Sequence, residues 1–133
     1  AIKGQEYGIE ILNDLEGNYV TTFAKKKIAM RSGETDIAET VDTKQFEKIG
    51  KKISNHLKHI ANLDVDCFVT ENGEVYVLEM NCRFGGQYPF THNAGVNVPL
   101  QILKWLKGYP TDSRIITQKN GIRSCKELVP VVF

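Results

Sequence analysis

Residues 75–86 read VYVLEMNCRFGG, and this stretch joins an apolar strand to a row of polar side chains. Its first residues are of the β-branched and aromatic types that favour strands. Because side chains alternate between the two faces of a strand, Glu79, Asn81 and Arg83 share one face. The sequence therefore predicts a strand that ends in a carboxylate, a carboxamide and a guanidinium. The residues between them are expected in the core, namely Tyr76, Leu78, Met80 and Cys82.

The residues before this strand extend it into a β-hairpin. Asn72-Gly73 is the strongest short-range signal for a two-residue turn. That turn places Asp66 opposite Glu79, with Cβ atoms about 5 Å apart. It also places Asp64 opposite Asn81. The apolar pairs expected on the core face are Val65 with Met80, Cys67 with Leu78 and Val69 with Tyr76.

Opposed carboxylates destabilise a hairpin, and a divalent cation between them would reverse that effect. Mg²⁺ takes carboxylate and carboxamide oxygens, so Asp66, Glu79 and Asn81 form a candidate ligand set, with the Asp64 carboxylate as an addition. Arg83 suits bidentate contact with a phosphate or a carboxylate. The glycines that follow would let backbone amides approach an anion. The alternative is a solvated acidic face on which Arg83 neutralises Glu79.

The rest of the chain predicts further strands and helices from its apolar periodicity. The expected strands span residues 7–12, 19–23, 39–41 and part of 121–133, and the expected helices span 42–62 and 99–107. Antiparallel hairpins with interleaved helices favour an α+β fold, an antiparallel sheet with the helices packed on one side. The triplet Lys25-Lys26-Lys27 is typical of a solvated face, and contact with an anionic ligand is the alternative.

The composition is that of one ordinary globular domain. The chain has 133 residues, 41% of them hydrophobic and 25% charged, which suffices for a real core. A net charge of +1 gives no general attraction to nucleic acid or to a membrane, so neither is expected as a partner. The 3 cysteines form no CxxC pair, which favours reduced thiols in a cytoplasmic protein. The chain begins without methionine, so we expect a fragment or a processed chain.

Three segments, taken together and in this order, resemble the ATP-grasp fold. GEVYVLEMNCRFGG at residues 73–86 is similar to a strand that carries E-x-N-x-R near the end of that fold. GQEYGIEIL at residues 4–12 is similar to an early strand of the same subdomain, and IAMRSGETDIAETV at residues 28–41 resembles the segment that leads to the nucleotide site in the carbamoyl-phosphate-synthase-like branch. The resemblance covers residues 1–107. It implies that the single domain is a C-terminal ATP-grasp subdomain, with residues 108–133 as an extension that carries one strand.

This resemblance implies ATP and Mg²⁺ as cofactors, with Mn²⁺ as an alternative metal. Glu79 would bridge two Mg²⁺ ions, Asn81 would bind one of them, and Asp66 would be the other metal-binding position. Arg83 would contact the γ-phosphate and the forming acyl phosphate. The implied catalytic residues are therefore Arg83, Glu79 and Asn81.

The resemblance also implies positions for the nucleoside part of ATP. Glu6 matches the acidic residue that binds the ribose hydroxyls. Ile28 and Met30 would be apolar neighbours of adenine. Arg31 stands where the family often has a histidine near the phosphates.

The tract after Gly86 matches the family only loosely, and it would help to form the acceptor end of the site. His92 and Asn93 are candidates for substrate contact there, with a structural or solvent-facing role as the alternative. Cys82 stands where the family usually has proline, which should change backbone stiffness more than chemistry.

The implied function is part of an ATP-dependent carboxylate–amine ligase, or of a similar ligase, that forms an acyl phosphate and resembles the large subunit of carbamoyl phosphate synthase. The implied partners are ATP, a carboxylate substrate, an N-terminal ATP-grasp subdomain and a preceding α/β domain. Assembly into a homo-oligomer stays open. This chain alone is expected to be inactive. A non-catalytic nucleotide-binding or scaffold module is the alternative.

Overall fold

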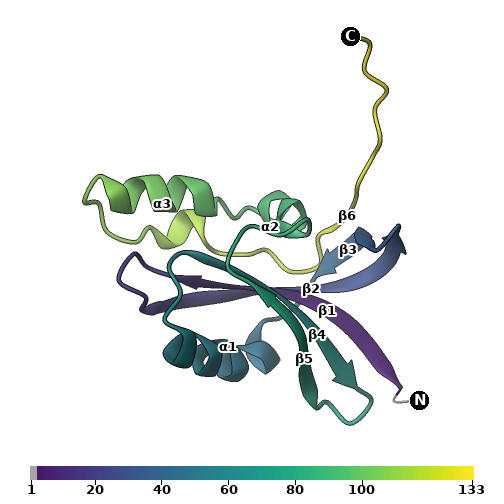
Figure 1. Cartoon of the computed structure of the whole chain (residues 1–133), viewed down its shortest axis with the longest axis horizontal. Helices are drawn as coiled ribbons and strands as arrows, with labels where there is room; N and C mark the ends of the chain where they lie inside the picture. The colour runs from purple at the N-terminus through teal and green to yellow at the C-terminus, as the bar shows by residue number, and fades with distance from the viewer. Residues whose placement is uncertain (1–2) are drawn as a thin grey trace.

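An antiparallel sheet of six strands organises residues 3–133, which are the residues that this computed structural model describes (Figure 1). The strand order is β5-β4-β1-β2-β3-β6. The strands are β1 Gly4–Asn13, β2 Tyr19–Arg31, β3 Glu34–Thr40, β4 Asn62–Thr70, β5 Val75–Asn81 and β6 Arg123–Cys125. The helices are α1 Lys44–Leu57, α2 Tyr88–Asn93 and α3 Val98–Leu106, with a 3₁₀ turn, η1, at Ser113–Ile115. The predicted α+β class with an antiparallel sheet is confirmed.

Strands β2 and β3 are longer than the sequence pattern predicted. Their pairing is irregular between Lys27 and Ala29 and again between Ala29 and Met30. Such irregularities interrupt the alternation of side chains, which is the signal that predicts a strand. Within residues 3–133, no helix has the length and apolar character needed to cross a membrane.

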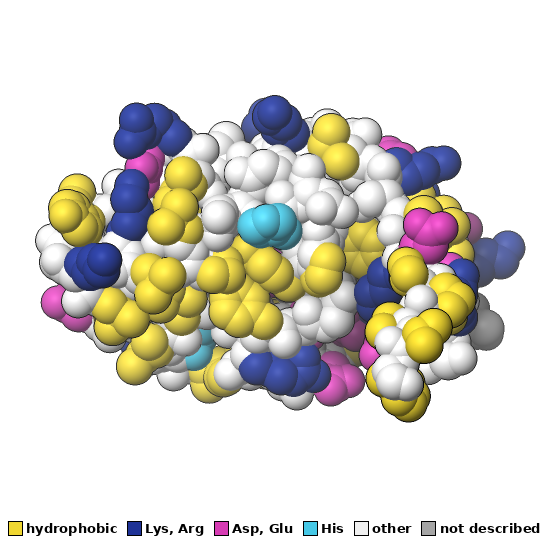
Figure 2. All heavy atoms as spheres, turned by 90° about the horizontal axis from the view of Figure 1, so that it is seen from above, with side chains coloured by type: hydrophobic (Ala, Val, Ile, Leu, Met, Phe, Trp, Pro, Cys, Tyr) yellow, Lys and Arg dark blue, Asp and Glu magenta, His cyan; other side chains and the backbone are white. Residues whose placement is uncertain are grey.

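Helices cover both faces of the sheet, which corrects the prediction that they pack on one side (Figure 1). On one face, Ile9 of β1 packs with Phe46 of α1. On the opposite face, Leu12 and Phe23 pack against the segment that contains α2 and α3. Glu10 of β1 shares that second face and is fully buried there. Figure 2 shows the α2–α3 side from above, where hydrophobic side chains remain at the surface; α3 exposes Leu100, Leu103 and Leu106.

The turn between β4 and β5 differs from the predicted two-residue turn. Residues 71–73 form a three-residue loop, closed by a hydrogen bond from the Thr70 N–H to the Glu74 carbonyl (3.0 Å). Gly73 has a φ of 82°, a left-handed conformation that glycine adopts without strain. The additional loop residue shifts the start of β5 by one position relative to the prediction.

A β-bulge at Leu78 then restores the predicted register. The observed pairs are Val69–Val75, Cys67–Val77, Asp66–Glu79, Val65–Met80 and Asp64–Asn81. The first two pairs differ by one position from the predicted ones, and the last three agree with them. Because the bulge compensates for the longer turn, the polar residues at the end of the hairpin lie opposite one another as predicted.

The residues of β5 that were predicted to point into the core are exposed instead. Tyr76, Leu78 and Met80 are 49%, 57% and 48% exposed, and Cys82 is also exposed. The shifted register turns Val75 and Val77 toward the core in their place. β5 is also an edge strand, so even side chains on its inner face are only partly covered.

Helix α1 ends at Leu57, well before the predicted end at Asn62. Lys58 has a φ of 51°, a left-handed conformation that terminates the helix. The following segment is fastened to β1, because the side-chain amide of Asn13 donates a hydrogen bond to the His59 carbonyl (2.9 Å). This long-range contact ends the helix where periodicity alone would continue it.

His59 should make stability depend on pH. Burial lowers the pKa of its imidazole, although the hydrogen bond that Nε2 makes with the Ile11 carbonyl (3.1 Å) acts in the opposite direction. Because the folded-state pKa lies below the unfolded value of about 6.5, the unfolded chain binds more protons. The free energy of unfolding should therefore be fully retained above about pH 6.5 and fall as the pH drops below it. Urea unfolding at a series of pH values should show a flatter slope in His59→Gln.

His56→Gln is the matched control, because His56 lies exposed in the last turn of α1. It should keep the pH slope of the wild type. The prediction fails if His59→Gln and the wild type show the same slope.

Candidate functional site

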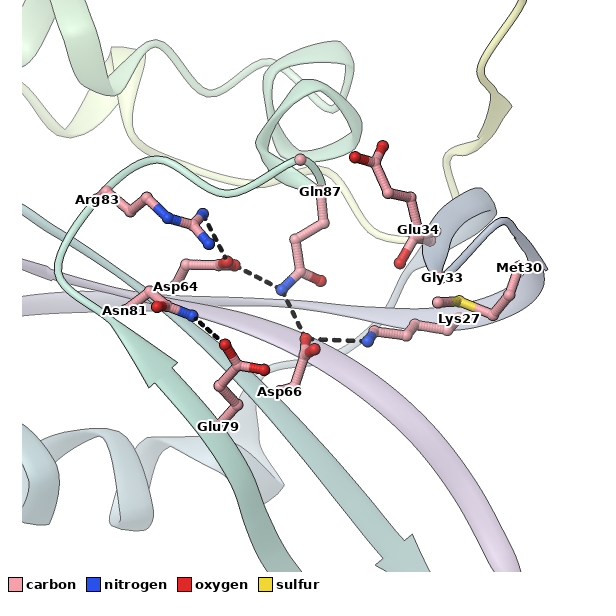
Figure 3. A pocket seen from close by; sticks show the side chains of 12 residues that line it. Lys27, Met30, Gly33, Glu34, Asp64, Asp66, Glu79, Asn81, Arg83 and Gln87 are labelled. Atoms are coloured by element: carbon pink, nitrogen blue, oxygen red, sulfur yellow. Dashed lines mark hydrogen bonds and ion pairs between the residues drawn. The ribbon is translucent and has the colours of Figure 1, made fainter.

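A polar pocket of about 200 Å³ lies beside the ends of β4 and β5 (Figure 3). Its acidic lining residues are Glu34, Asp64, Asp66 and Glu79, and its basic lining residues are Lys27 and Arg83. They come from β2, β3, β4, β5 and the loop after β5, so the strand order of the sheet brings them together.

The predicted metal positions line this one pocket. Asp66 and Glu79 are cross-strand partners, and Asn81 follows Glu79 on the same face of β5. The side-chain amide of Asn81 donates a hydrogen bond to Oε1 of Glu79 (2.8 Å). The three side chains therefore present two carboxylates and a carboxamide to the same space, as Figure 3 shows.

Lys27 compensates the charge of Asp66. Its Nζ lies 2.9 Å from Oδ1 of Asp66 and 3.6 Å from Oε2 of Glu6. Lys27 is only 7% exposed, so the prediction of a solvated triplet is wrong for this residue. In an extended strand alternate side chains point the same way, so Lys26 is exposed while its two neighbours point inward.

Asp64 lies deeper in the pocket than Asp66. Its Oδ2 is 3.5 Å from Nη1 of Arg83, and its Oδ1 accepts a hydrogen bond from Nε2 of Gln87 (2.6 Å). Burial raises the pKa of the Asp64 carboxyl, and the hydrogen bond from Gln87 opposes this. Gly85 packs directly on the carboxylate, where a Cβ would overlap Oδ2. In this structure the absence of a side chain at Gly85 therefore leaves room for the Asp64 carboxylate.

A fully buried ion pair lies beside the site, since Glu10 on β1 is the cross-strand partner of Asp64. Nζ of Lys25 lies 2.6 Å from Oε2 of Glu10 and 2.8 Å from the hydroxyl of Thr91 on α2. The Thr91 hydroxyl also donates to Glu10 (2.6 Å). The prediction of a solvated face is thus wrong for Lys25 as well, because α2 covers this part of the sheet.

The predicted adenine and phosphate contacts are divided among different surfaces. Met30 lines the pocket. Ile28 lines a separate hollow together with Lys26, and Arg31 forms an ion pair with Asp36 (3.0 Å) outside the pocket lining. The structure therefore brings Met30, but neither Ile28 nor Arg31, to the predicted metal positions.

The candidates for the acceptor end lie on α2, outside the pocket lining. His92 and Asn93 are both exposed. The ring of His92 lies 3.4 Å from the Tyr88 hydroxyl. The nearer pocket residues of this segment are Gly86 and Gln87.

Sequence reasoning did not assign five of the pocket residues to the site, namely Lys27, Gly33, Glu34, Thr35 and Gln87. Recognition of β2 as one strand through residue 31 would have revealed the inward direction of Lys27. Glu34 begins β3 and lies in the segment 28–41 whose resemblance pointed to the nucleotide site. Gln87 carries no local signal, because its position depends on how the segment after β5 crosses the sheet.

The donor chemistry of the pocket fits a hard cation such as Mg²⁺. Two carboxylates and a carboxamide are the oxygen ligands that Mg²⁺ uses alongside phosphate oxygens. Among residues 3–133 there is no group of three His, Cys, Asp or Glu side chains that could hold a metal by themselves. The carboxamide of Asn81 and oxygens of a ligand would therefore have to complete the set.

The chain belongs to the ATP-grasp family: residues 1–127 match the family described as ATP-grasp in the biosynthetic pathway with Ter operon. A comparison with curated proteins gives no match.

Solved structures share this fold at low sequence identity. The biotin carboxylase domain of thermophilic 2-oxoglutarate carboxylase bound to bicarbonate has a TM-score of 0.73 and 18% identity, with coverage of 94% of this chain and 31% of that chain. Biotin carboxylase from Campylobacter jejuni, in its beta-gamma-ATP complex, has a TM-score of 0.68 and 18% identity, with coverage of 86% of this chain and 28% of that chain. N5-carboxyaminoimidazole synthetase from Staphylococcus aureus has a TM-score of 0.63 and 13% identity, with coverage of 84% of this chain and 32% of that chain. The chain therefore spans about a third or less of these proteins.

Loss of the buried lysine should destabilise the fold strongly. Lys25→Met would leave the Glu10 carboxylate buried without its cation, so we expect a loss of about 3 to 5 kcal/mol in the free energy of unfolding. Lys26→Met, at the exposed neighbouring position, should change it by less than about 0.5 kcal/mol. Urea unfolding of the two variants measures the difference.

The double variant Glu10→Leu/Lys25→Met should recover most of the loss, since it removes the stranded charge. Similar unfolding midpoints for Lys25→Met and Lys26→Met would contradict the assignment of a structural ion pair.

Proposed function

We propose that this chain is the MgATP-binding subdomain of an ATP-dependent carboxylate–amine ligase, or of a similar ligase. The observation that carries the proposal is the meeting of the three metal positions with Arg83 in one pocket. Two of the solved structures with this fold support the ligand classes, since one is a beta-gamma-ATP complex and the other is bound to bicarbonate.

In this proposal the residues of the chain hold and neutralise charge. Asp66, Glu79 and Asn81 would hold Mg²⁺, which would supply neutralisation of phosphate oxygens. Arg83 is 57% exposed and its contact with Asp64 is long, so its guanidinium can turn toward a phosphate. Phosphoryl transfer depends mainly on positioning and charge neutralisation, so it requires no nucleophilic side chain.

The proposed chemistry has two steps. A carboxylate oxygen of the substrate attacks the γ-phosphorus of ATP, which gives an acyl phosphate and ADP. An amine, or a similar nucleophile, then attacks the acyl carbon and releases phosphate. We also propose that the parent protein is similar to the carbamoyl-phosphate-synthase-like branch, on the resemblance of residues 28–41. Glu6 of this chain would bind the ribose hydroxyls of ATP. An N-terminal subdomain and a preceding α/β domain would supply the remaining contacts to ATP and the substrate.

A non-catalytic nucleotide-binding module is the second candidate function. The Lys27 ammonium group, 2.9 Å from Asp66, favours it, because this cation already neutralises one of the two opposed carboxylates. Such a module would bind a nucleotide for regulation or for assembly with another chain.

Removal of the metal ligands should abolish turnover in the full-length parent protein. Glu79→Gln and Asn81→Asp should each lower carboxylate-dependent ADP formation by at least about 100-fold, because each alters the charge around the transferred phosphoryl group. Glu71→Gln is the matched control, since Glu71 lies exposed in the turn of the same hairpin.

Steady-state ADP release and calorimetric titration with MgATP should be measured together. Wild-type turnover in either site variant would overturn the metal assignment. Tight MgATP binding without turnover across a panel of carboxylates would favour the non-catalytic module.

A further inference from the structure

Gln87 is a buried side chain of the pocket to which the proposed function gives no role. It is 5% exposed and immediately precedes α2. Its Nε2 donates to Oδ1 of Asp64 (2.6 Å) and to Oδ1 of Asp66 (3.0 Å). Figure 3 shows its amide between the two carboxylates, which come from alternate positions on one face of β4.

The orientation of this amide follows from its neighbours. With the two groups of the amide exchanged, the carbonyl oxygen would face two carboxylates and both hydrogen bonds would be lost. In the present orientation Oε1 is buried and finds no hydrogen-bond partner within the described part of the chain. A buried acceptor without a partner is unfavourable, so the two donated bonds outweigh that loss.

Gly8 provides the space for this amide. Gly8 is the cross-strand neighbour of Asp66 on β4, and it lies on the central strand β1. A Cβ built on Gly8 would overlap Oε1 of Gln87. The absence of a side chain at this point of the sheet therefore lets an amide from a distant loop reach the carboxylates.

We infer that Gln87 is a positioning residue for the cation site: its amide orients Asp64 and Asp66, and Gly8 is required because Gln87 occupies the space of its side chain. This inference rests on the proposed function, since it assigns the purpose of the two hydrogen bonds to a site that binds a metal. Carboxylates that bind metals are commonly fixed in this way by hydrogen bonds from neighbouring groups.

Gln87→Met tests the role of the donated bonds, because methionine has a similar length and no N–H group. In the full-length parent protein with ATP present, Mn²⁺ binding can be followed by electron paramagnetic resonance of the free ion. We expect Gln87→Met to weaken Mn²⁺ binding by about 10- to 100-fold.

Gln101→Met is the matched control for burial. Gln101 is fully buried, and it bonds the backbone of Pro110 and Asp112. None of these three residues lines the pocket. This variant should lose stability and keep the Mn²⁺ affinity of the wild type. If the role of Gln87 is only structural, Gln87→Met will also lose stability and keep the Mn²⁺ affinity of the wild type. That outcome overturns the inference.

Gln87→Glu changes the charge and almost nothing of the shape. It places a third carboxylate beside Asp64 and Asp66, so the thermal midpoint should fall without a cation and rise more steeply with Mn²⁺ than that of the wild type. Gln101→Glu should show no such dependence on Mn²⁺. Equal Mn²⁺ responses in Gln87→Glu and the wild type would contradict the inference.

The Gly8 contact has its own test, which needs no metal. Gly8→Ala should destabilise the wild type and should be nearly neutral in a Gln87→Ala background, because the clash is then removed. Equal destabilisation in both backgrounds overturns the assigned contact. Loss of Mn²⁺ binding by the wild type would instead overturn the proposed function together with this inference, so the two failures can be distinguished.

Discussion

The pocket depends on one cross-strand pair, Asp66 opposite Glu79. Two carboxylates at such a position repel each other, so the hairpin tolerates them only with compensation. Lys27 and Gln87 both reach the same oxygen of Asp66, at 2.9 and 3.0 Å. Asn81 donates a hydrogen bond to Glu79 from the neighbouring position on β5. The chain thus balances its own acidic pair with a cation and two amides drawn from three different parts of the fold.

The face of the sheet that α2 and α3 cover is divided into an apolar part and a polar part. Near α3 it is apolar, with Leu12 and Phe23 in the core. Near α2 it is polar, with the Glu10–Lys25 ion pair fully buried against Thr91 of that helix. Gln87 and Thr91 lie one helical turn apart, and both tie the α2 segment to charged groups of the sheet. Since a buried charge requires a partner, these contacts fix where α2 can lie.

Local patterns in the sequence predicted the sheet, the hairpin and the pair Asp66–Glu79, but part of that success came from two deviations that cancel. The turn has one residue more than predicted, and the bulge at Leu78 absorbs it. Between the two deviations the predicted pairs were wrong, and Tyr76 proved to be exposed. Turn type and bulge position depend on packing against the rest of the sheet, which a single hairpin sequence does not encode.

The contacts that complete the pocket lie far apart in the sequence, so periodicity could not reveal them. Gln87 and Asp66 are 21 residues apart, and Lys25 and Thr91 are 66 residues apart. A triplet of lysines is typical of a solvated face. Lys25 is buried because α2 packs above it, where Thr91 and Glu10 bind its ammonium group. The need for glycine at position 8 could not be predicted either, because it depends on the contact with the distant Gln87.

The arrangement of charges also bears on how a ligand could bind under the proposed function. A cation alone would compete with Lys27 for Asp66 and would leave the lysine without its partner. A polyphosphate alone would attract Lys27 and Arg83 but would meet the carboxylates of Asp66 and Glu79. A metal–nucleotide complex carries both charges in one body, so it can replace each ion pair with a new one. The pocket is therefore better matched to the complex than to either component, and the two should bind with positive coupling.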